Sequence, residues 1–397
     1  MNKKSAMHIA VLFAFTYMVS YMTRINFGAV ISEIASDTGY ARAALATAVT
    51  ASSVTYGLGQ LVSGVCADKF KPKMLCFTGL IVTAIVNLLF PFSKSTYTMA
   101  VLWGINGFAQ AFMWPPMVKL MSELMTEDEY KHSTVIVSWG SSAGTILMYL
   151  LSPVAIAFLG WRSVFIICGA AAIIMLGIWQ RLCVDVSPYE TASSKVKDGG
   201  KIFTPMFIMI MLAIVLQGML RDGITTWMPS LISDTYHLSN VVSIFTGVAL
   251  PIFSVICFHL AERLYRAIPN NPVKCAGMVF FLGTVSAFVL YVLSGKNAAL
   301  SVFFSALLTG CMHGVNLLLI CMVPPFYKKG GGVATVSGIL NSCTYIGSSI
   351  STYGIAVISD KLGWSATILT WIIIAFLGCA VCFMCTKLWN GFLAENN

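Results

Sequence analysis

The sequence has few charged residues, and this scarcity excludes a soluble protein. Asp, Glu, Lys and Arg make up 10% of the 397 residues, whereas 58% of the residues are hydrophobic. A soluble domain carries about 25% charged residues, which cover its surface. The hydrophobic residues form repeated runs of about 18 to 25 residues, the length that an α-helix needs to cross a bilayer. The short alternating segments that a membrane β-barrel requires are missing.

Motifs for ATP hydrolysis, metal binding and covalent catalysis are missing as well. The sequence has no Gly-rich phosphate loop followed by Lys and Ser or Thr, no metal-ligand pattern and no nucleophile motif. Most of the twelve cysteines lie inside hydrophobic runs, where we interpret them as small packing residues. The sequence therefore predicts that the protein is not an enzyme and has no cofactor and no metal site.

The hydrophobic runs predict an all-α integral membrane protein with twelve transmembrane helices in two pseudo-symmetric six-helix bundles. The first bundle covers residues 1–182 and the second covers 203–397. The longer polar segment 183–202 between them has the Ser, Gly and Lys content of a linker. The expected helices span 8–34, 43–66, 74–92, 98–124, 133–157, 162–182, 203–232, 240–262, 272–294, 299–323, 332–357 and 364–388.

The net charge of +9 arises from 24 Lys and Arg against 15 Asp and Glu, and its placement predicts topology rather than nucleic-acid binding. If both termini are cytoplasmic, sixteen Lys and Arg residues fall in cytoplasmic segments and five in outer loops. The positive-inside rule favours this orientation. We therefore expect a multi-pass protein of a prokaryotic inner (plasma) membrane, embedded in the lipid bilayer as a monomer with both termini in the cytoplasm.

Short sequence repeats indicate that the two halves are related by duplication. The same tripeptide follows Arg24 and Arg221 at the same distance of twelve residues. A second tripeptide precedes the last expected helix of each half. Together these matches favour a duplicated six-helix unit, an arrangement that supports alternating access to a central site. The repeats are Ser-Asp-Thr at 36–38 and 233–235, and Leu-Gly-Trp at 159–161 and 362–364.

Arg24 and Arg221 are the two cations that lie deep within expected helices. Burying each one in a membrane costs about 2.5 to 3.5 kcal/mol on insertion scales, so both should face a cavity or a partner. A guanidinium is always charged, and its planar fork of donors matches phosphate or carboxylate oxygens. Two arginines on equivalent helices therefore predict a clamp for an anion. The alternative interpretation is that an arginine pairs with a protein group such as Asp222.

Polar side chains near the two arginines complete the expected substrate site. Helical spacing places Tyr21 on the face of Arg24 and Gln217 on the face of Arg221. Other helices carry similar polar stripes, although small and hydroxyl side chains in membranes also serve to join helices. The expected substrate-binding residues are Arg24, Arg221, Tyr21, Tyr56, Gln60, Ser141, Gln217, Asn341 and Tyr345.

Coupling and gating are expected of a second group of residues. Asp222 is the only carboxylate that we place near the membrane centre, and it is a candidate for proton coupling or counter-charge. His313 is a candidate for the same role, with a hydrogen-bonded interior histidine as the alternative. The loop between the second and third helices carries Asp68, Lys69 and Lys73. We expect these charges to close a cytoplasmic gate by pairing with facing helix ends.

Five segments of the sequence match a known family: YMTRIN (21–26), GVCADKFKPK (64–73), NGFAQAFMWPP (106–116), LRDGITTWMP (220–229) and YKKGGGVATVSG (327–338). With these segments the chain resembles the major facilitator superfamily, and within it the organophosphate:phosphate antiporter family of glycerol-phosphate and hexose-phosphate transporters. This resemblance implies the major facilitator fold, contact of Arg24 and Arg221 with the substrate phosphate, and rocking of the two halves about it. The chain departs from the family in carrying Gln60 where a lysine is expected and Ser141 where a histidine is expected.

These features predict a secondary transporter of a small organic anion, in particular a phosphorylated metabolite that is exchanged for inorganic phosphate. Two alternatives stay open. One is a proton-coupled symporter of organic carboxylates, which would use Asp222 or His313. The other is a transporter-like sensor that binds its ligand and signals to a membrane partner.

Overall fold

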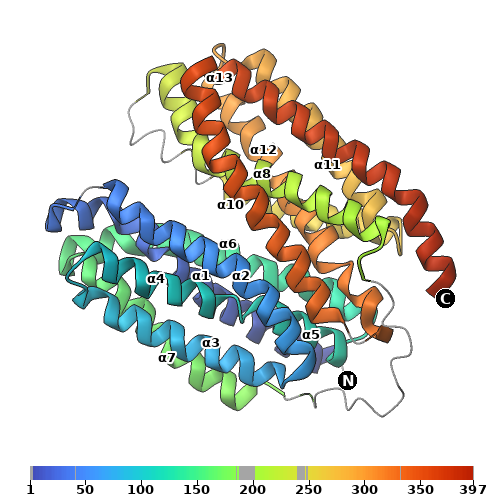
Figure 1. Cartoon of the computed structure of the whole chain (residues 1–397), viewed down its shortest axis with the longest axis horizontal. Coiled ribbons are helices and arrows are strands. Elements are labelled where there is room, and N and C mark those ends of the chain that lie inside the picture. The colour runs from blue at the N-terminus through green and yellow to red at the C-terminus, as the bar shows by residue number, and fades with distance from the viewer. Residues whose placement is uncertain are drawn as a thin grey trace. The chain divides into compact units, whose positions relative to one another are not determined.

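The computed structural model of the chain describes residues 3–40, 42–184, 186, 202–238, 246, 249–330 and 332–396, and these residues are almost entirely helical (Figure 1). The all-α prediction is confirmed for this part of the chain. Most of the expected linker 183–202 and the start of the expected helix 240–262 lie outside the described residues. The elements are α1 (Lys3–Thr38), α2 (Arg42–Lys69), α3 (Pro72–Leu89), η1 (Phe90–Phe92), α4 (Thr96–Gln110), α5 (Trp114–Leu124), α6 (Glu127–Leu159), α7 (Trp161–Leu182), α8 (Pro205–Tyr236), α10 (Ala249–Ala267), α11 (Pro272–Leu293), α12 (Ala298–Asn316), η2 (Leu317–Cys321), η3 (Pro324–Gly330) and α13 (Val333–Asn396).

Within this described part, eight helical segments are long and apolar enough to cross a membrane. The exposed surface of the helices is correspondingly hydrophobic, with residues such as Ile174, Phe281 and Phe376 more than half exposed. A soluble protein does not expose so many large apolar side chains, whereas lipid tails cover them at no cost. The number of twelve spans and the two six-helix bundles stay predictions.

The helix expected at 98–124 is broken in the structure. α4 ends at Gln110, and α5 starts at Trp114 with Pro115 and Pro116 in its first turn. Proline has no N–H to donate, and its ring clashes with the carbonyl group four residues earlier. It therefore fits the first turn of a helix but interrupts a longer one. The break leaves the carbonyl oxygen of Ala111 without the usual donor at position 115.

The chain divides into two compact units. The first comprises Met1–Lys197 and Pro324–Ser342, and the second comprises Asp198–Val323 and Cys343–Asn397. In the first unit α1 lies along α6 and α7, and α4 lies against α2 and α3. In the second unit α12 lies against α8, α10 and α11. The bundle boundaries 1–182 and 203–397 stay a prediction, since this division follows proximity in space rather than the duplicated unit.

An aromatic cluster fixes the C-terminal half of α1 in the first unit. Phe27 is fully buried, and its ring centroid lies 5.0 Å from that of Phe90 and 5.4 Å from that of Trp103. Phe90 in turn stacks on Phe165 of α7 at 4.4 Å. Such aromatic pairs contribute about 0.5 to 1.5 kcal/mol each beyond their buried area. The cluster therefore holds α1, which carries Arg24, against α4 and α7.

In each unit the same hydrogen bond joins the tryptophan of the Leu-Gly-Trp segment to the aspartate of the Ser-Asp-Thr segment. Trp161 Nε1 donates to Asp37 Oδ2 at 2.9 Å, and Trp364 Nε1 donates to Asp234 Oδ2 at 3.0 Å. The glycine before each tryptophan has a positive φ, of 77° and 80°, which side chains rarely tolerate. Gly160 lets the chain turn sharply into α7, and Gly363 forms a kink inside α13 just before Trp364. The matching contacts support a duplicated unit.

Asp37→Ala is expected to lower the thermal unfolding temperature at neutral pH. The hydrogen bond from Trp161, and then that from Arg162, lower the pKa of Asp37 below its usual value of about 3.9. A carboxylate whose pKa falls on folding stabilises the protein above its unfolded pKa, and this stabilisation is lost as the pH falls through the folded pKa. The difference between the native chain and the variant should therefore shrink below about pH 4.

Differential scanning fluorimetry in detergent at several pH values measures this difference. Glu33→Ala serves as a matched control, because Glu33 is an exposed carboxylate on the same helix. An equal loss for both variants, or a difference that does not change with pH, would contradict the role assigned to Asp37.

Candidate functional site

Arg24 stacks on two tyrosine rings in the first unit. Its guanidinium carbon lies 4.1 Å from the ring centroid of Tyr21 and 4.8 Å from that of Tyr56 on α2. Cation–π contact holds the guanidinium in place, and a guanidinium carries its N–H donors in a planar fork. The structure therefore brings together these three residues of the expected site. A guanidinium fixed in this way is suited to bind an oxyanion by its edge.

Further aromatic side chains extend the row of rings that begins with Tyr21 beside Arg24. The ring centroid of Tyr17 lies 5.1 Å from that of Tyr21 and 5.2 Å from that of Trp114. Trp114 is the first residue of α5, so the break between α4 and α5 is what brings its ring to α1. This row of rings is rigid because each ring contacts the next and each side chain has few rotatable bonds.

A buried amide network holds α1 from its other side. Gln110 Nε2 donates to Thr23 Oγ1 at 2.8 Å, and Asn106 Nδ2 donates to the carbonyl oxygen of Thr23 at 3.0 Å. The hydroxyl of Ser20 donates to Gln110 Oε1. These hydrogen bonds fix α1 one residue before Arg24. The signal for this role was the pair of amides four residues apart in a hydrophobic helix.

Glycines of α6 set the position of Tyr21. A Cβ atom at Gly144 would lie 3.0 Å from the Cβ of Tyr21, which is closer than carbon atoms normally approach. A Cβ at Gly140 would collide with the carbonyl oxygen of Ala14. The two glycines therefore allow α1 to lie directly on α6, as small residues do in membrane helices. Ser141, between them, donates its hydroxyl to the carbonyl oxygen of Ser138 in its own helix at 2.7 Å.

Gln60 and Asn341 bind each other within the first unit. Asn341 Nδ2 donates to Gln60 Oε1 at 2.9 Å, and Gln60 Nε2 donates to the carbonyl oxygen of Ala111 at 3.3 Å. That carbonyl is the one left without a helical donor by Pro115. The fully buried Gln60 thus satisfies a backbone group that would otherwise be costly to bury. Contact of Gln60 or Asn341 with a substrate stays a prediction.

Arg221 forms a bidentate ion pair with its neighbour Asp222 in the second unit. Arg221 Nε donates to Asp222 Oδ1 at 2.7 Å, and Arg221 Nη2 donates to Asp222 Oδ2 at 2.9 Å. The side chains are 14% and 27% exposed. Ser348 also hydrogen-bonds to this carboxylate, and His313 lies near both charges. The pairing that the sequence offered as an alternative is therefore present in the structure.

Close backbone contact with α13 positions the part of α8 that carries Arg221. A Cβ atom at Gly218 would collide with the carbonyl oxygen of Thr344, so only glycine fits one turn before Arg221. Gln217 Nε2 donates to the carbonyl oxygen of Met312 at 3.0 Å, which joins α8 to α12. Gln217 Oε1 is buried and accepts no hydrogen bond from the described residues. Tyr345 follows Thr344 on α13 and is half-buried.

Asp68 caps the beginning of α13 within the first unit. Its Oδ2 accepts from the backbone N–H of Thr335 at 2.7 Å, and its Oδ1 accepts from that of Ala334 at 3.1 Å. The first N–H groups of a helix have no partner within the helix, and the positive end of the helix dipole attracts a carboxylate. Lys119 Nζ lies 3.5 Å from the same carboxylate. Asp68 thus contacts the beginning of a helix from a distant part of the sequence.

The other expected gate residues behave differently. Lys73 Nζ donates to the carbonyl oxygen of Gln180 in the last turn of α7 at 3.0 Å, and Lys69 is exposed. Sequence reasoning missed Lys119 and Glu123, which lie 3.5 Å apart one turn apart in α5. A lysine four residues before a glutamate inside a hydrophobic helix was the available signal. The gating role itself stays a prediction.

The fold and these motifs are shared with known proteins. The Major Facilitator Superfamily model matches residues 13–352. The chain belongs to the Major Facilitator Superfamily. The membrane sensor protein UhpC of Escherichia coli is 23% identical over 90% of this chain and 87% of its own length. The glycerol-3-phosphate transporter of Bacillus subtilis is 25% identical over 88% of this chain and 85% of its own length.

A solved structure of the superfamily shares the fold. The proton:xylose symporter XylE matches with a TM-score of 0.76 over 96% of this chain and 95% of its own, at 11% identity. The major facilitator fold and the resemblance to the organophosphate:phosphate antiporter family are thereby confirmed. The chain is a multi-pass membrane protein of a transporter superfamily and not an enzyme.

In this superfamily member, Asp68→Ala is expected to lower the free energy of unfolding by about 2 kcal/mol, because it removes a helix cap and leaves Lys119 without one of its acidic partners. Lys69→Ala is the matched control, since Lys69 is exposed beside it. Urea or thermal unfolding in detergent measures both variants. A loss for Asp68→Ala no larger than that for the control would refute the capping role.

Proposed function

We propose that the chain is a secondary transporter that exchanges a phosphorylated organic anion for inorganic phosphate by alternating access about Arg24 and Arg221. The observation that carries this proposal is the cation–π contact of Arg24 with Tyr21 and Tyr56, which holds in place a planar fork of donors that matches the oxygens of an oxyanion. Similarity to a glycerol-3-phosphate transporter over most of the chain supports a phosphate ester as the substrate.

Asp222 acts in this proposal as the counter-charge of an empty site. A guanidinium without a partner is costly in a low-dielectric membrane protein, and the bidentate carboxylate removes this cost when no anion is bound. A substrate phosphate then competes with Asp222 for Arg221. Binding of the anion is thereby weak enough to be reversible, as transport requires.

Gln60 and Ser141 favour a substrate of modest negative charge. Both side chains bond to backbone carbonyl oxygens, and neither adds positive charge to the site. A singly charged phosphate ester or a phosphonate fits two arginines better than a highly charged compound does. We place the transporter in the lipid bilayer of an inner membrane as a monomer with cytoplasmic termini.

The arginine clamp predicts that Arg24→Lys and Arg221→Lys each reduce phosphate exchange by about tenfold or more, because lysine keeps the charge but loses the bidentate fork. The measurement is uptake of labelled phosphate into proteoliposomes that contain unlabelled phosphate. Arg162→Lys is the matched control, since Arg162 is 53% exposed in a surface ion pair. Normal exchange by both site variants would disprove the clamp.

Proton-coupled symport of carboxylates is tested by Asp222→Asn. In an exchanger this variant should still exchange phosphate without a proton gradient, and the half-saturating phosphate concentration should fall because the competing carboxylate charge is gone. Initial exchange rates at several phosphate concentrations, at equal internal and external pH, measure this. If the native protein instead accumulates a carboxylate only when a pH gradient is present, and Asp222→Asn abolishes this accumulation, the protein is a proton-coupled symporter.

A sensor is the second candidate, because the similarity to a membrane sensor protein extends over 90% of the chain. A sensor binds its ligand without flux. Binding of glycerol-3-phosphate or phosphate is measured by thermal shift, and exchange is measured with the same preparation in proteoliposomes. Binding without exchange would show that the protein is a sensor and not a transporter.

A further inference from the structure

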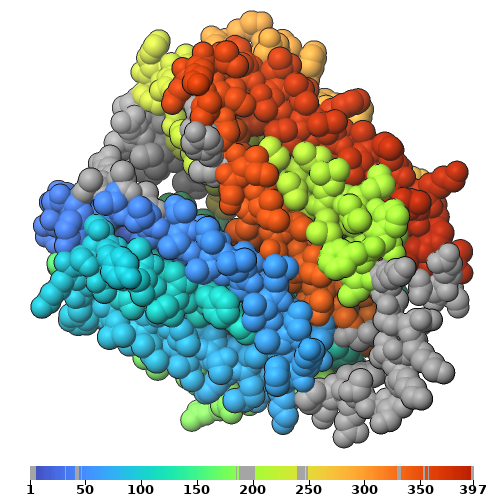
Figure 2. Space-filling model, in the orientation of Figure 1, coloured from blue at the N-terminus to red at the C-terminus, as the bar shows by residue number. Residues whose placement is uncertain are grey.

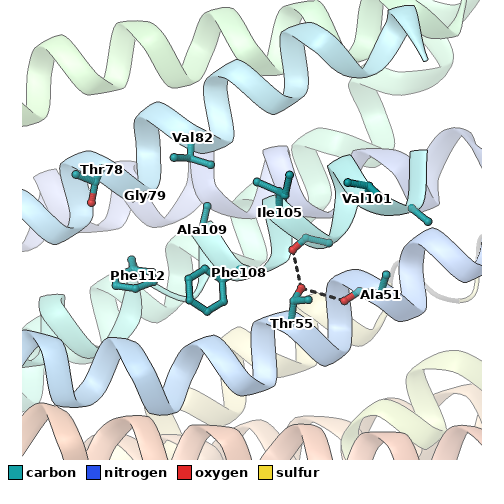
Figure 3. Close-up of a pocket in the computed structure, with 12 residues that line it drawn as sticks. Ala51, Thr55, Thr78, Gly79, Val82, Val101, Ile105, Phe108, Ala109 and Phe112 are labelled. Carbon is teal, nitrogen blue, oxygen red and sulfur yellow. Dashed lines mark hydrogen bonds between the residues drawn. The ribbon is translucent and has the colours of Figure 1, made fainter. Parts of the chain in front are cut away.

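An apolar groove of about 630 Å³ lies on the first unit among α2, α3 and α4. α4 reaches the surface of this unit between α2 and α3, where its teal surface is visible in Figure 2. Figure 3 shows the side chains that line the groove, and none of them is charged. Its position does not coincide with Arg24 or Tyr56. The lining includes Ala51, Thr55, Thr78, Val82, Ile105 and Phe108.

The polar atoms of the lining are turned toward the backbone. Thr55 Oγ1 bonds to the carbonyl oxygens of Ala51 at 2.9 Å and of Gly104 at 2.7 Å, as Figure 3 shows. Thr78 donates its hydroxyl to the carbonyl oxygen of Leu75 at 2.9 Å. Because these hydroxyl groups are already hydrogen-bonded, a molecule bound in the groove would contact mainly carbon atoms. Apolar spaces of this kind exclude water and accept apolar groups.

Small residues form the floor of the groove, and large ones form its rim. A Cβ atom at Gly104 would lie 3.8 Å from side-chain carbons of Ala51 and Thr55, an ordinary contact, so the floor has room above it. Ile105 and Phe108 at the rim are 45% and 40% exposed. The groove therefore opens on the surface of the unit beside α3, which is long and apolar enough to cross a membrane.

Positive charge marks one end of the groove. Lys71 is the N-cap residue of α3 and lies two turns before Thr78, at the end where Thr78 lines the groove. Lys71 and Lys69 are both exposed. The acidic residue of this connection, Asp68, is bound to the start of α13 and to Lys119. The connection between α2 and α3 thus places two exposed lysines beyond this end of the groove, and lysines at the end of a membrane helix attract anionic lipid head groups.

We propose that this groove binds one acyl chain of an anionic phospholipid, with the lipid phosphate against Lys71. The apolar lining of the groove suits an acyl chain, and the exposed Lys69 and Lys71 suit a negative head group. The occupant contacts the face of α4 that carries Ile105 and Phe108, while Asn106 and Gln110 of the same helix hold α1. The lipid therefore supports the helix on which the position of Arg24 depends.

The test uses the full chain in nanodiscs of phosphatidylcholine that contain phosphatidylglycerol with a diazirine in its acyl chain. After illumination, mass spectrometry locates the labelled residues. The label is expected on residues 101–112 and 78–82. Gly104→Leu fills the floor of the groove and should lower this labelling by about tenfold. A loss of this size corresponds to the burial of fewer than two methylene groups of the lipid. Gly177→Leu is the matched control, because Gly177 is exposed on α7 with open space around it.

The head-group contact is tested separately with Lys71→Gln. The preference for the phosphatidylglycerol probe over a phosphatidylcholine probe should fall about fivefold, the factor expected for one lysine near an anionic surface. Ile105→Phe fills the groove from its rim and replaces Gly104→Leu if thermal unfolding shows that the latter does not fold. Labelling spread evenly over the exposed helices, equal labelling of the filled and control variants, or a crosslink to a second copy of the chain at the groove would overturn the proposal. An unchanged lipid preference in Lys71→Gln would also overturn it.

Discussion

The cost of placing a guanidinium in a membrane is the constraint on which the candidate site depends. Arg24 and Arg221 cannot lose their charge, so the surrounding helices must supply compensation wherever these residues lie. The two units do so differently. Tyr21 and Tyr56 stack on Arg24, whereas Asp222 pairs with Arg221 through both oxygens. The related positions of the two arginines in the duplicated sequence therefore do not imply identical roles.

The helices that carry these arginines are held by contacts that do not depend on the hydrophobic effect. Lipid tails are as apolar as leucine, so helices in a membrane associate through close packing and hydrogen bonds. Gly140 and Gly144 let α1 lie on α6, and Gly218 lets α8 lie on α13. The amides of Asn106 and Gln110 bind Thr23. Rigid support of this kind keeps each guanidinium in place while the site is empty.

Backbone groups released by helix ends organise the remaining polar residues. Pro115 frees the carbonyl oxygen of Ala111, which Gln60 then satisfies. The first N–H groups of α13 are satisfied by Asp68. In a membrane protein such groups must find a partner inside the protein, because no water is present in the hydrocarbon region. Several residues that sequence patterns assign to substrate or gate contacts thus also have a structural role.

The length and composition of the hydrophobic runs were sufficient to predict an all-helical membrane protein, because a membrane helix satisfies its own backbone and needs only apolar side chains. The repeated Ser-Asp-Thr and Leu-Gly-Trp segments predicted related halves, and the matching bonds of Asp37 with Trp161 and of Asp234 with Trp364 agree with this. The spacing of Tyr21 and Arg24 placed them on one face of one helix. The partners of Gln60, Asn341 and Arg221 were not predictable from spacing. They depend on which helices lie side by side, how closely their glycines let them approach, and which backbone groups a proline leaves without a donor.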